Sequence, residues 1–143
     1  MKKDDIQVLR EIQKNTELAI RAVDTVIDKV YDDDLVLQLS RQSLKYSELR
    51  SEAVDKLLSA HLEPTRLSLL EEWRVAGKLH KDTFLNTSTS HIAELAIQES
   101  SRKISRMYRT LHKYESVGNA TVEIAKEFMD VEEANIARLR KFL

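Results

Sequence analysis

The chain has 143 residues, a length that suits one well-filled domain and is short for two. Its 23 basic and 24 acidic residues nearly cancel, so charge gives no reason to expect nucleic acid or an anionic membrane as a partner. The absence of cysteine excludes disulfides and thiolate chemistry, and the two glycines and one proline argue against a turn-rich all-β fold. Long helices with few connections are therefore expected.

The first half of the chain predicts two long helices. Apolar residues recur at steps of three and four over about 5–30, which is typical of a helix with one buried face. The acidic stretch 31–34 interrupts this pattern and supplies residues that can cap a second helix. We predict that helix over about 34–62, with Pro64 as its stop signal.

The second helix has a broad apolar arc. Tyr46 and Leu49 lie on one side of this arc, and Leu44 and Leu58 lie on the other. Serines and Arg50 fall between them, so the sequence predicts that this polar strip also faces the interior.

Residues 63–87 form the one long connection that the sequence predicts. Within it, the segment 67–77 has apolar residues at helical spacing, which indicates a short helix lying over the rest of the protein. Trp73 is expected to act as a lid that closes the helical core.

Two further helices are predicted after the connection. The cluster NTSTS provides capping side chains for a helix over about 88–116, which carries an apolar stripe along its whole length. Gly118 is expected to adopt the left-handed conformation that ends many helices. The last helix is predicted over about 119–142.

These elements predict an all-α fold with a single domain over residues 1–143. Four long amphipathic helices form two antiparallel hairpins, and a long crossover that carries a short helix joins the hairpins. Four-helix bundles with one long crossover have the ferritin-like topology. The segment 63–87 is long enough to return along a bundle of this height.

A polar layer is predicted at the middle of this bundle. Counting residues from the two hairpin turns puts polar side chains of all four helices at about the same height, where each stripe is otherwise apolar. The predicted members of the layer are Gln13, Thr16, Ser47, Arg50, Ser51, Ser100, Glu132 and Asn135.

Ferritin-like bundles bind metal ions at about the middle of the bundle. The ligands of their metal centre can therefore be compared with the residues of this layer. A di-iron centre takes one Glu from each of two helices and a Glu-x-x-His from each of the other two. Glu132 and Asn135 have that spacing, but Asn replaces His, and Glu17, Glu48 and Glu99 lie off their stripes. No cofactor is predicted; an iron or manganese ion, if bound, would have Glu132 as its inner ligand.

The four histidines do not complete such a centre, because they lie near helix ends or in the crossover. No triad, phosphate loop or metalloprotease motif is present, so no catalytic residue is predicted. The favoured interpretation is a structural layer in which Arg50 neutralises Glu132 and the hydroxyl and amide groups complete the hydrogen bonds. A degenerate metal site and a small-ligand pocket are the alternatives.

The chain also resembles a known group of proteins. The segment ELAIQESSRKISRMYRTLHKYESVGNATVEIAKEFMDVEEANIARLRKFL, with SRQSLKYSELRSEAVDKLLSA before it, is similar to uncharacterised ferritin-like proteins of anaerobic Gram-positive bacteria. The resemblance covers essentially the whole chain. It implies a four-helix ferritin-like bundle of unknown function, and Glu132 alone carries over from the metal ligands of the wider class.

Three functional hypotheses follow from the sequence. The first is a non-catalytic bundle with a degenerate metal site that acts by association, as a homodimer or with a protein partner, because its apolar surface is wider than one core needs. The second is an Fe- or Mn-binding ferritin-like protein. The third is an adaptor or chaperone-like bundle that binds an amphipathic helix. With no signal-peptide pattern and no long apolar run, a cytoplasmic protein is expected, without membrane or nucleic-acid partners.

Overall fold

The fold is known from a computed structural model that describes residues 1–84 and 86–143. Residue 85, which belongs to the predicted crossover, lies outside the described residues. The described part of the chain contains no β-strand, which confirms the all-α prediction. Its α-helices are α1 (Lys3–Val26), α2 (Asp33–Ser59), α3 (Leu69–Thr83), α4 (Thr89–Lys113) and α5 (Asn119–Leu139), and its 3₁₀ helices are η1 (Ile27–Lys29) and η2 (Arg140–Phe142).

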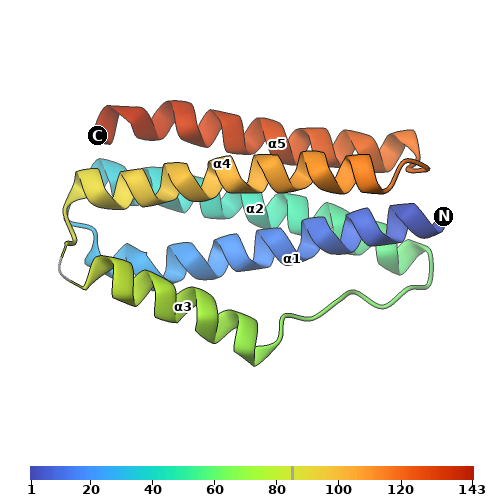
Figure 1. Ribbon diagram of the computed structural model, residues 1–143, viewed down its shortest axis with the longest axis horizontal. Coiled ribbons are helices and arrows are strands. Elements are labelled where there is room, and N and C mark those ends of the chain that lie inside the picture. The colour runs from blue at the N-terminus through green and yellow to red at the C-terminus, as the bar shows by residue number, and fades with distance from the viewer. Residues whose placement is uncertain (85) are drawn as a thin grey trace.

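The four long helices form two antiparallel pairs (Figure 1). One pair is α1 with α2, and the other is α4 with α5. The chain leaves α2 near the N-terminus of α1, returns along α1 through an extended segment and α3, and then enters α4. As a result α2 and α4 run in the same direction, and the turn between α4 and α5 lies near the N-terminus of the chain.

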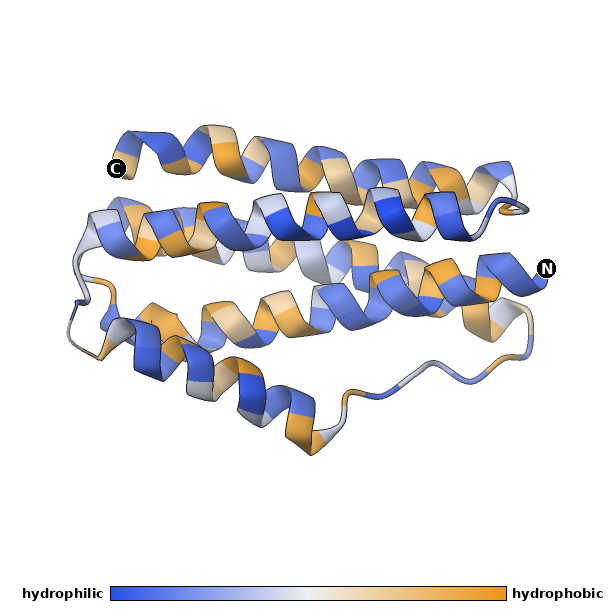
Figure 2. Cartoon of the chain, in the orientation of Figure 1, coloured by the Kyte–Doolittle hydropathy of each residue, from blue (hydrophilic) through white to orange (hydrophobic). Residues whose placement is uncertain are grey.

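The core consists of two hydrophobic clusters, one toward each end of the long helices. One cluster centres on Phe128, Leu9 and Met107, and the other contains Leu35, Ile92 and other apolar residues. Hydrophilic residues cover much of the outer faces of the helices, as Figure 2 shows. None of the described helices is both long and apolar enough to cross a bilayer.

The buried face of α2 differs from the predicted one. Leu44 and Leu58 are exposed, so the prediction that they face the interior is wrong. A continuous stripe at helical spacing is buried instead, made of Leu35, Leu39, Gln42, Tyr46, Leu49, Ala53 and Leu57. Burying this stripe turns the opposite side of α2, and the polar strip beside it, toward solvent.

The end of α2 is set by hydrogen bonds rather than by proline. The backbone N–H of His61 donates to the carbonyl of Leu58, and that of Leu62 donates to the carbonyl of Leu57, at 2.9 Å in each case. His61 has a positive φ of 59°. This is a Schellman motif, which terminates α2 at Ser59, earlier than the predicted stop at Pro64.

The crossover contains a longer helix than predicted, with a different role for its tryptophan. Ser68 caps α3 and accepts a hydrogen bond from the N–H of Glu71 at 3.1 Å. The helix packs beside the C-terminal half of α1 (Figure 1). Trp73 is 69% exposed, so the prediction that it closes the core is wrong. The inner face of α3 is formed by other residues, of which Thr83 is fully covered.

A tether joins the first turn of α1 to the turn between α4 and α5. The N–H of Gly118 donates to Asp5 Oδ1 at 2.8 Å, and the N–H of Ser116 donates to Asp4 Oδ2 at 3.1 Å. Gly118 has φ −71° and ψ 159°, so it is an extended N-cap residue of α5. The predicted left-handed conformation of Gly118 is therefore wrong, because the carboxylate of Asp5 organises this turn.

The pKa of Asp5 gives the tether a testable pH dependence. Burial raises this pKa, but hydrogen bonds from Gly118, Thr121 and Lys2 outweigh it, so the pKa lies below its ordinary value of 3.8. The carboxylate therefore stabilises the protein above that value, and the stabilisation is lost as the pH falls through the lower folded-state pKa.

We expect Asp5→Asn to lower the free energy of unfolding by about 1 kcal/mol at neutral pH. The deficit should shrink below about pH 4, where Asp5 becomes protonated in the parent protein as well. Urea unfolding at several pH values measures both effects. Asp28→Asn is the matched control, because Asp28 is exposed and makes no side-chain hydrogen bond among the described residues. A deficit that does not change with pH would contradict a role for the carboxylate charge.

Candidate functional site

The residues of the predicted polar layer divide into three groups in the structure. Ser100, Glu132 and Asn135 are buried together with Tyr46, and these four residues are called the mid-core cluster below. Gln13 and Arg50 belong to a second group on the side of α1 that faces the crossover. There Gln13 binds Thr65 of the crossover, and Arg50 of α2 binds Glu17 of α1. The remaining members of the prediction, Thr16, Ser47 and Ser51, take part in neither group.

The mid-core cluster lies between the two hydrophobic clusters. Asn135 Nδ2 donates to the hydroxyl of Tyr46 at 3.1 Å across the α2–α5 contact. Glu132 lies one turn earlier on α5, and Ser100 faces the same phenol from α4. Three long helices thus bring polar groups to one point inside an otherwise apolar core.

The environment of Tyr46 keeps its hydroxyl protonated. Burial raises the pKa of the Tyr46 phenol well above its ordinary value of 10.0, and the negative charge of Glu132 raises it further. Tyr46 is therefore a neutral hydrogen-bond donor at any physiological pH. On the outer side of the ring, the ammonium of Lys103 lies 4.9 Å from the ring centroid, a cation–π arrangement.

Glu132 is the unusual member of the cluster. Its side chain is 0% exposed and faces the Tyr46 hydroxyl, but neither carboxylate oxygen has a hydrogen bond of ordinary length and angle among the described residues. The predicted pairing with Arg50 is wrong, because Arg50 Nε contacts Glu17 Oε1 at 2.8 Å. A buried carboxylate without a cationic partner costs folding free energy. Such a cost is typical of a residue retained for a reason other than stability.

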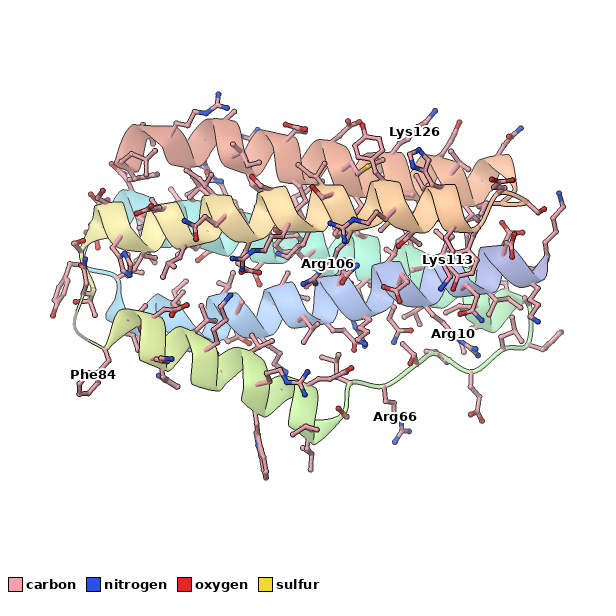
Figure 3. All side chains as sticks on the ribbon, in the orientation of Figure 1. Arg10, Arg66, Phe84, Arg106, Lys113 and Lys126 are labelled. Carbon is pink, nitrogen blue, oxygen red and sulfur yellow. The ribbon has the colours of Figure 1, made fainter. Side chains whose placement is uncertain are left out.

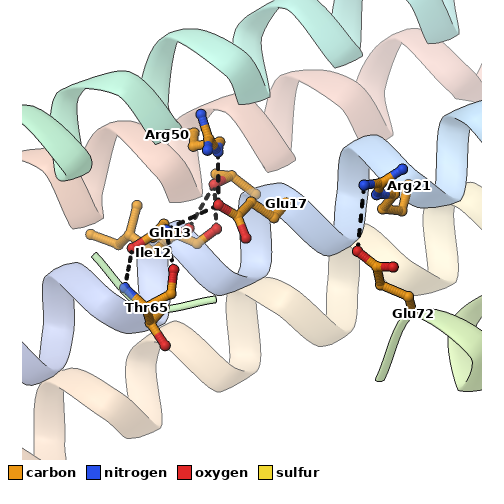
Figure 4. A network of polar contacts seen from close by, with 8 residues as sticks. Ile12, Gln13, Glu17, Arg21, Arg50, Thr65 and Glu72 are labelled. Atoms are coloured by element: carbon orange, nitrogen blue, oxygen red, sulfur yellow. Dashed lines mark hydrogen bonds and ion pairs between the residues drawn. The ribbon is translucent and has the colours of Figure 1, made fainter. Parts of the chain in front are cut away.

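The second group holds the crossover against α1, as Figure 4 shows. Gln13 donates from Nε2 to the carbonyl of Thr65 at 2.7 Å and accepts from the N–H of Thr65 at 3.0 Å. Gln13 also donates to Glu17, which in turn pairs with Arg50 of α2. We call Gln13, Glu17, Arg50 and Thr65 the crossover network. A buried glutamine thereby supplies both hydrogen bonds that a neighbouring strand would supply to an extended backbone.

The other three predicted members of the layer have local roles. Thr16 is buried, but its hydroxyl donates to the carbonyls of Ile12 and Gln13 in its own helix, at 2.8 Å in each case. Ser47 and Ser51 are exposed on the outer face of α2. Their assignment to the interior is wrong because the buried stripe of α2 runs through Tyr46 instead.

The burial of two glutamines of α2 was not predicted from the sequence. Gln38 and Gln42 are buried, and the side-chain nitrogen of each has no hydrogen-bond partner among the described residues. Both continue the helical spacing of Leu35, Leu39 and Tyr46. That spacing is the signal that could have revealed them, because a polar residue between apolar members of one stripe shares their face.

No protein-family model, curated protein or solved structure matches this chain. The function must therefore be inferred from the geometry of the described residues.

The residues of the mid-core cluster do not fit a two-metal carboxylate centre. Such a centre needs several carboxylates and imidazoles. Within the mid-core cluster, Glu132 is the one carboxylate, and Tyr46, Ser100 and Asn135 are neutral. No group of three His, Asp or Glu side chains in the described part of the chain is arranged to hold a metal ion.

The carboxylates and histidines considered from the sequence lie elsewhere. Glu17 belongs to the crossover network, Glu48 is exposed beside Lys45, and Glu99 pairs with Lys78 and Arg102 on the surface. His80 contacts Lys29, with 2.8 Å between its Nδ1 and the ammonium. His91 contacts the carbonyl of Asp82 at 2.9 Å. These side chains fasten neighbouring elements to each other.

Proposed function

We propose that this chain is a ferritin-like four-helix bundle of the cytoplasm that performs no chemistry of its own and binds an amphipathic helix of a protein partner along α3. The ferritin-like assignment is supported by two antiparallel pairs joined by a long crossover, with α2 and α4 in the same direction (Figure 1). The proposal of a binding role rests on one observation, the exposed outer face of α3.

The outer face of α3 carries a stripe with the spacing of a helix–helix seam. Its residues follow one another at steps of three and four and are all exposed: Leu70, Trp73, Gly77, His80 and Phe84. His80 lies at the edge of this stripe, where its ring also contacts Lys29. We call this stripe the α3 seam. Phe84 is 81% exposed and points away from the helices in Figure 3. Figure 2 shows that the N-terminal end of α3 is hydrophobic. Leu69, the first residue of α3, is also exposed.

The inner face of α3 already attaches this helix to the rest of the protein, so folding does not require the apolar residues on its outer face. Ion pairs fasten α3 to α1, with Lys14 Nζ 2.7 Å from Glu71 and Arg21 3.4 Å from Glu72. Apolar residues on the same side, such as Leu79, pack against the core. The outer face nevertheless exposes three large apolar side chains, Leu70, Trp73 and Phe84, and apolar side chains grouped on one face are expected to be covered. The α3 seam therefore has the character of a docking face.

Charge favours a partner with acidic residues. Arg74 and Lys81 border the α3 seam on one side, and neither forms an ion pair among the described residues. The acids in the first turn of α3, Glu71 and Glu72, already form ion pairs with α1. In a second copy of the chain these two acids are therefore not free to pair with the basic border of the seam. An amphipathic helix with an apolar stripe and an acidic flank satisfies both the seam and its basic border.

The single tryptophan makes this proposal directly testable. A synthetic helical peptide with a leucine stripe and glutamate flanks is titrated into the protein, and Trp73 fluorescence is recorded. We expect a blue shift, and an affinity at least about ten-fold higher than for the same peptide with lysine flanks. Arg74→Glu should reduce that preference.

Leu70→Asp should weaken binding by at least about ten-fold, whereas Leu44→Asp, an equally exposed leucine on α2, should leave it unchanged. Equal loss in the two variants, or no spectral change with either peptide, would overturn the proposal. Sedimentation of the protein alone tests the other occupant. A dimer that Leu70→Asp dissociates would show that a second copy, rather than a partner helix, covers the α3 seam.

A further inference from the structure

A narrow cavity of about 60 Å³ lies between α1, α2, α3 and α4, beside the mid-core cluster. Its walls are mostly apolar, and three alanines, Ala19 and Ala22 of α1 and Ala96 of α4, leave the space that larger side chains would fill. Leu39, Leu79 and Ile92 are among the larger apolar side chains that line the rest of the wall. The volume is several times what one water molecule needs, so the cavity has room for a short chain of heavy atoms.

Hydrogen-bond donors gather at one end of this cavity. Gln42 lines the wall, is 4% exposed, and has a side-chain nitrogen without a partner among the described residues. Lys103 also lines the cavity, with its ammonium over the ring of Tyr46, which follows Gln42 by one turn of α2. Lys103 forms no ion pair in the described part of the chain. The hydroxyl of Ser100 lies beside them. An unsatisfied buried donor is costly, so its presence indicates an acceptor that completes the site.

The charges at the mouth of the cavity also favour an anionic group. Glu99 lines the cavity too, but its carboxylate is neutralised by Lys78 at 3.3 Å and Arg102 at 2.5 Å. Lys103 is therefore the charged group without an ion-pair partner among those that line the cavity, whereas Glu132, which acts on the Tyr46 phenol, does not line it. A carboxylate there would accept a hydrogen bond from Gln42 and pair with Lys103, while an alkyl chain would fill the space between the alanines.

We propose that this cavity binds a short straight-chain monocarboxylate, with its carboxylate at Gln42 and Lys103 and its alkyl chain between α1 and α4. The site is separate from the α3 seam and does not depend on the proposed partner. Small residues determine how long a chain fits, and the two donors determine that the head group is an acid rather than an alcohol or an amine.

Titration calorimetry with hexanoate, hexanol and hexylamine tests the class of ligand. We expect hexanoate to bind at least about ten-fold more tightly than hexanol, and hexylamine to bind least. Lys103→Met and Gln42→Leu should each weaken hexanoate by about ten-fold and change hexanol binding little. Tighter binding of hexylamine would show that the unpaired Glu132 governs the site, and would overturn the proposal.

A substitution that fills the cavity tests its location. Ala96→Leu should abolish hexanoate binding, whereas Ala137→Leu, on the exposed face of α5, should leave it unchanged. Circular dichroism verifies that each variant is folded. If Ala96→Leu does not fold, Ala22→Leu is used in its place. Unchanged binding in a folded cavity-filled variant, or no hexanoate binding to the parent protein, would overturn the proposal. Leu70→Asp in the α3 seam should leave hexanoate binding intact, so failure of one site does not imply failure of the other.

Discussion

Replacing Glu132 by glutamine is expected to stabilise the protein by about 2 kcal/mol at neutral pH. Glutamine has nearly the same shape as glutamate and carries no charge, so the core keeps its packing and loses an unpaired buried carboxylate. The amide oxygen can accept from Tyr46, and its nitrogen can donate to the oxygens of the mid-core cluster. Urea unfolding of the parent and variant measures the difference.

Glu133→Gln is the matched control, because Glu133 is exposed on the next position of α5 and its replacement should change stability by less than about 0.5 kcal/mol. A destabilised Glu132→Gln variant would mean that the carboxylate gains more from the Tyr46 hydroxyl beside it than its burial costs. A stabilised variant would mean that Glu132 is maintained at a cost to folding, which is typical of functional residues.

Replacing Gln13 by alanine is expected to destabilise the protein by about 2 kcal/mol and to loosen the crossover. Gln13 makes two hydrogen bonds to the backbone of Thr65 and one to Glu17, and all three are lost in the variant. Among the described residues, no other side chain binds both the N–H and the carbonyl of one residue in the segment before α3. Urea unfolding measures the stability, and limited proteolysis measures the accessibility of residues 60–68.

The control for this variant is Gln98→Ala, on the exposed face of α4, which should alter neither stability nor cleavage. Loss of stability without faster cleavage in 60–68 would contradict the role of Gln13 in holding the crossover. The result also bears on α3, since the same segment leads directly into that helix.

The sequence was most informative where one helix had one clear stripe. Glu132 and Asn135, the two residues of the last helix that were predicted to face the interior, are both buried in α5. The spacing of large apolar residues such as Phe128 and Leu139 defines the inner face of that helix, and any polar residue between them must share it. The burial of Ser100 in α4 was predictable for the same reason.

The sequence misled where a helix had apolar residues on several sides. Leu44 and Leu58 widened the apparent arc of α2, and its centre was placed near Ser47 rather than near Gln42 and Tyr46. An amphipathic pattern fixes the rotation of a helix only when its apolar face is narrow. Exposed leucines at the surface are ordinary in folded proteins, so they do not mark the core by themselves.

The sequence also did not show which side chains of neighbouring helices contact each other. Counting from the turns placed Arg50 and Glu132 at similar heights, but height alone does not say which neighbour a side chain meets. Arg50 lies toward α1, where it reaches Glu17, whereas Glu132 of α5 is fully enclosed. The crossover network depends on where an irregular segment runs, and no periodic pattern in the sequence encodes the contact between Gln13 and Thr65.

The tether between Asp5 and Gly118 has a consequence for the order in which the chain assembles. The two residues are 113 positions apart, so the first turn of α1 leaves the ribosome long before its partner exists. Local contacts let the first hairpin form early, while a contact of this separation is made late in folding. We therefore expect the loss of the Asp5 carboxylate to accelerate unfolding and to leave the refolding rate almost unchanged. The tether would then act as a latch, which closes last and governs how long the native state persists.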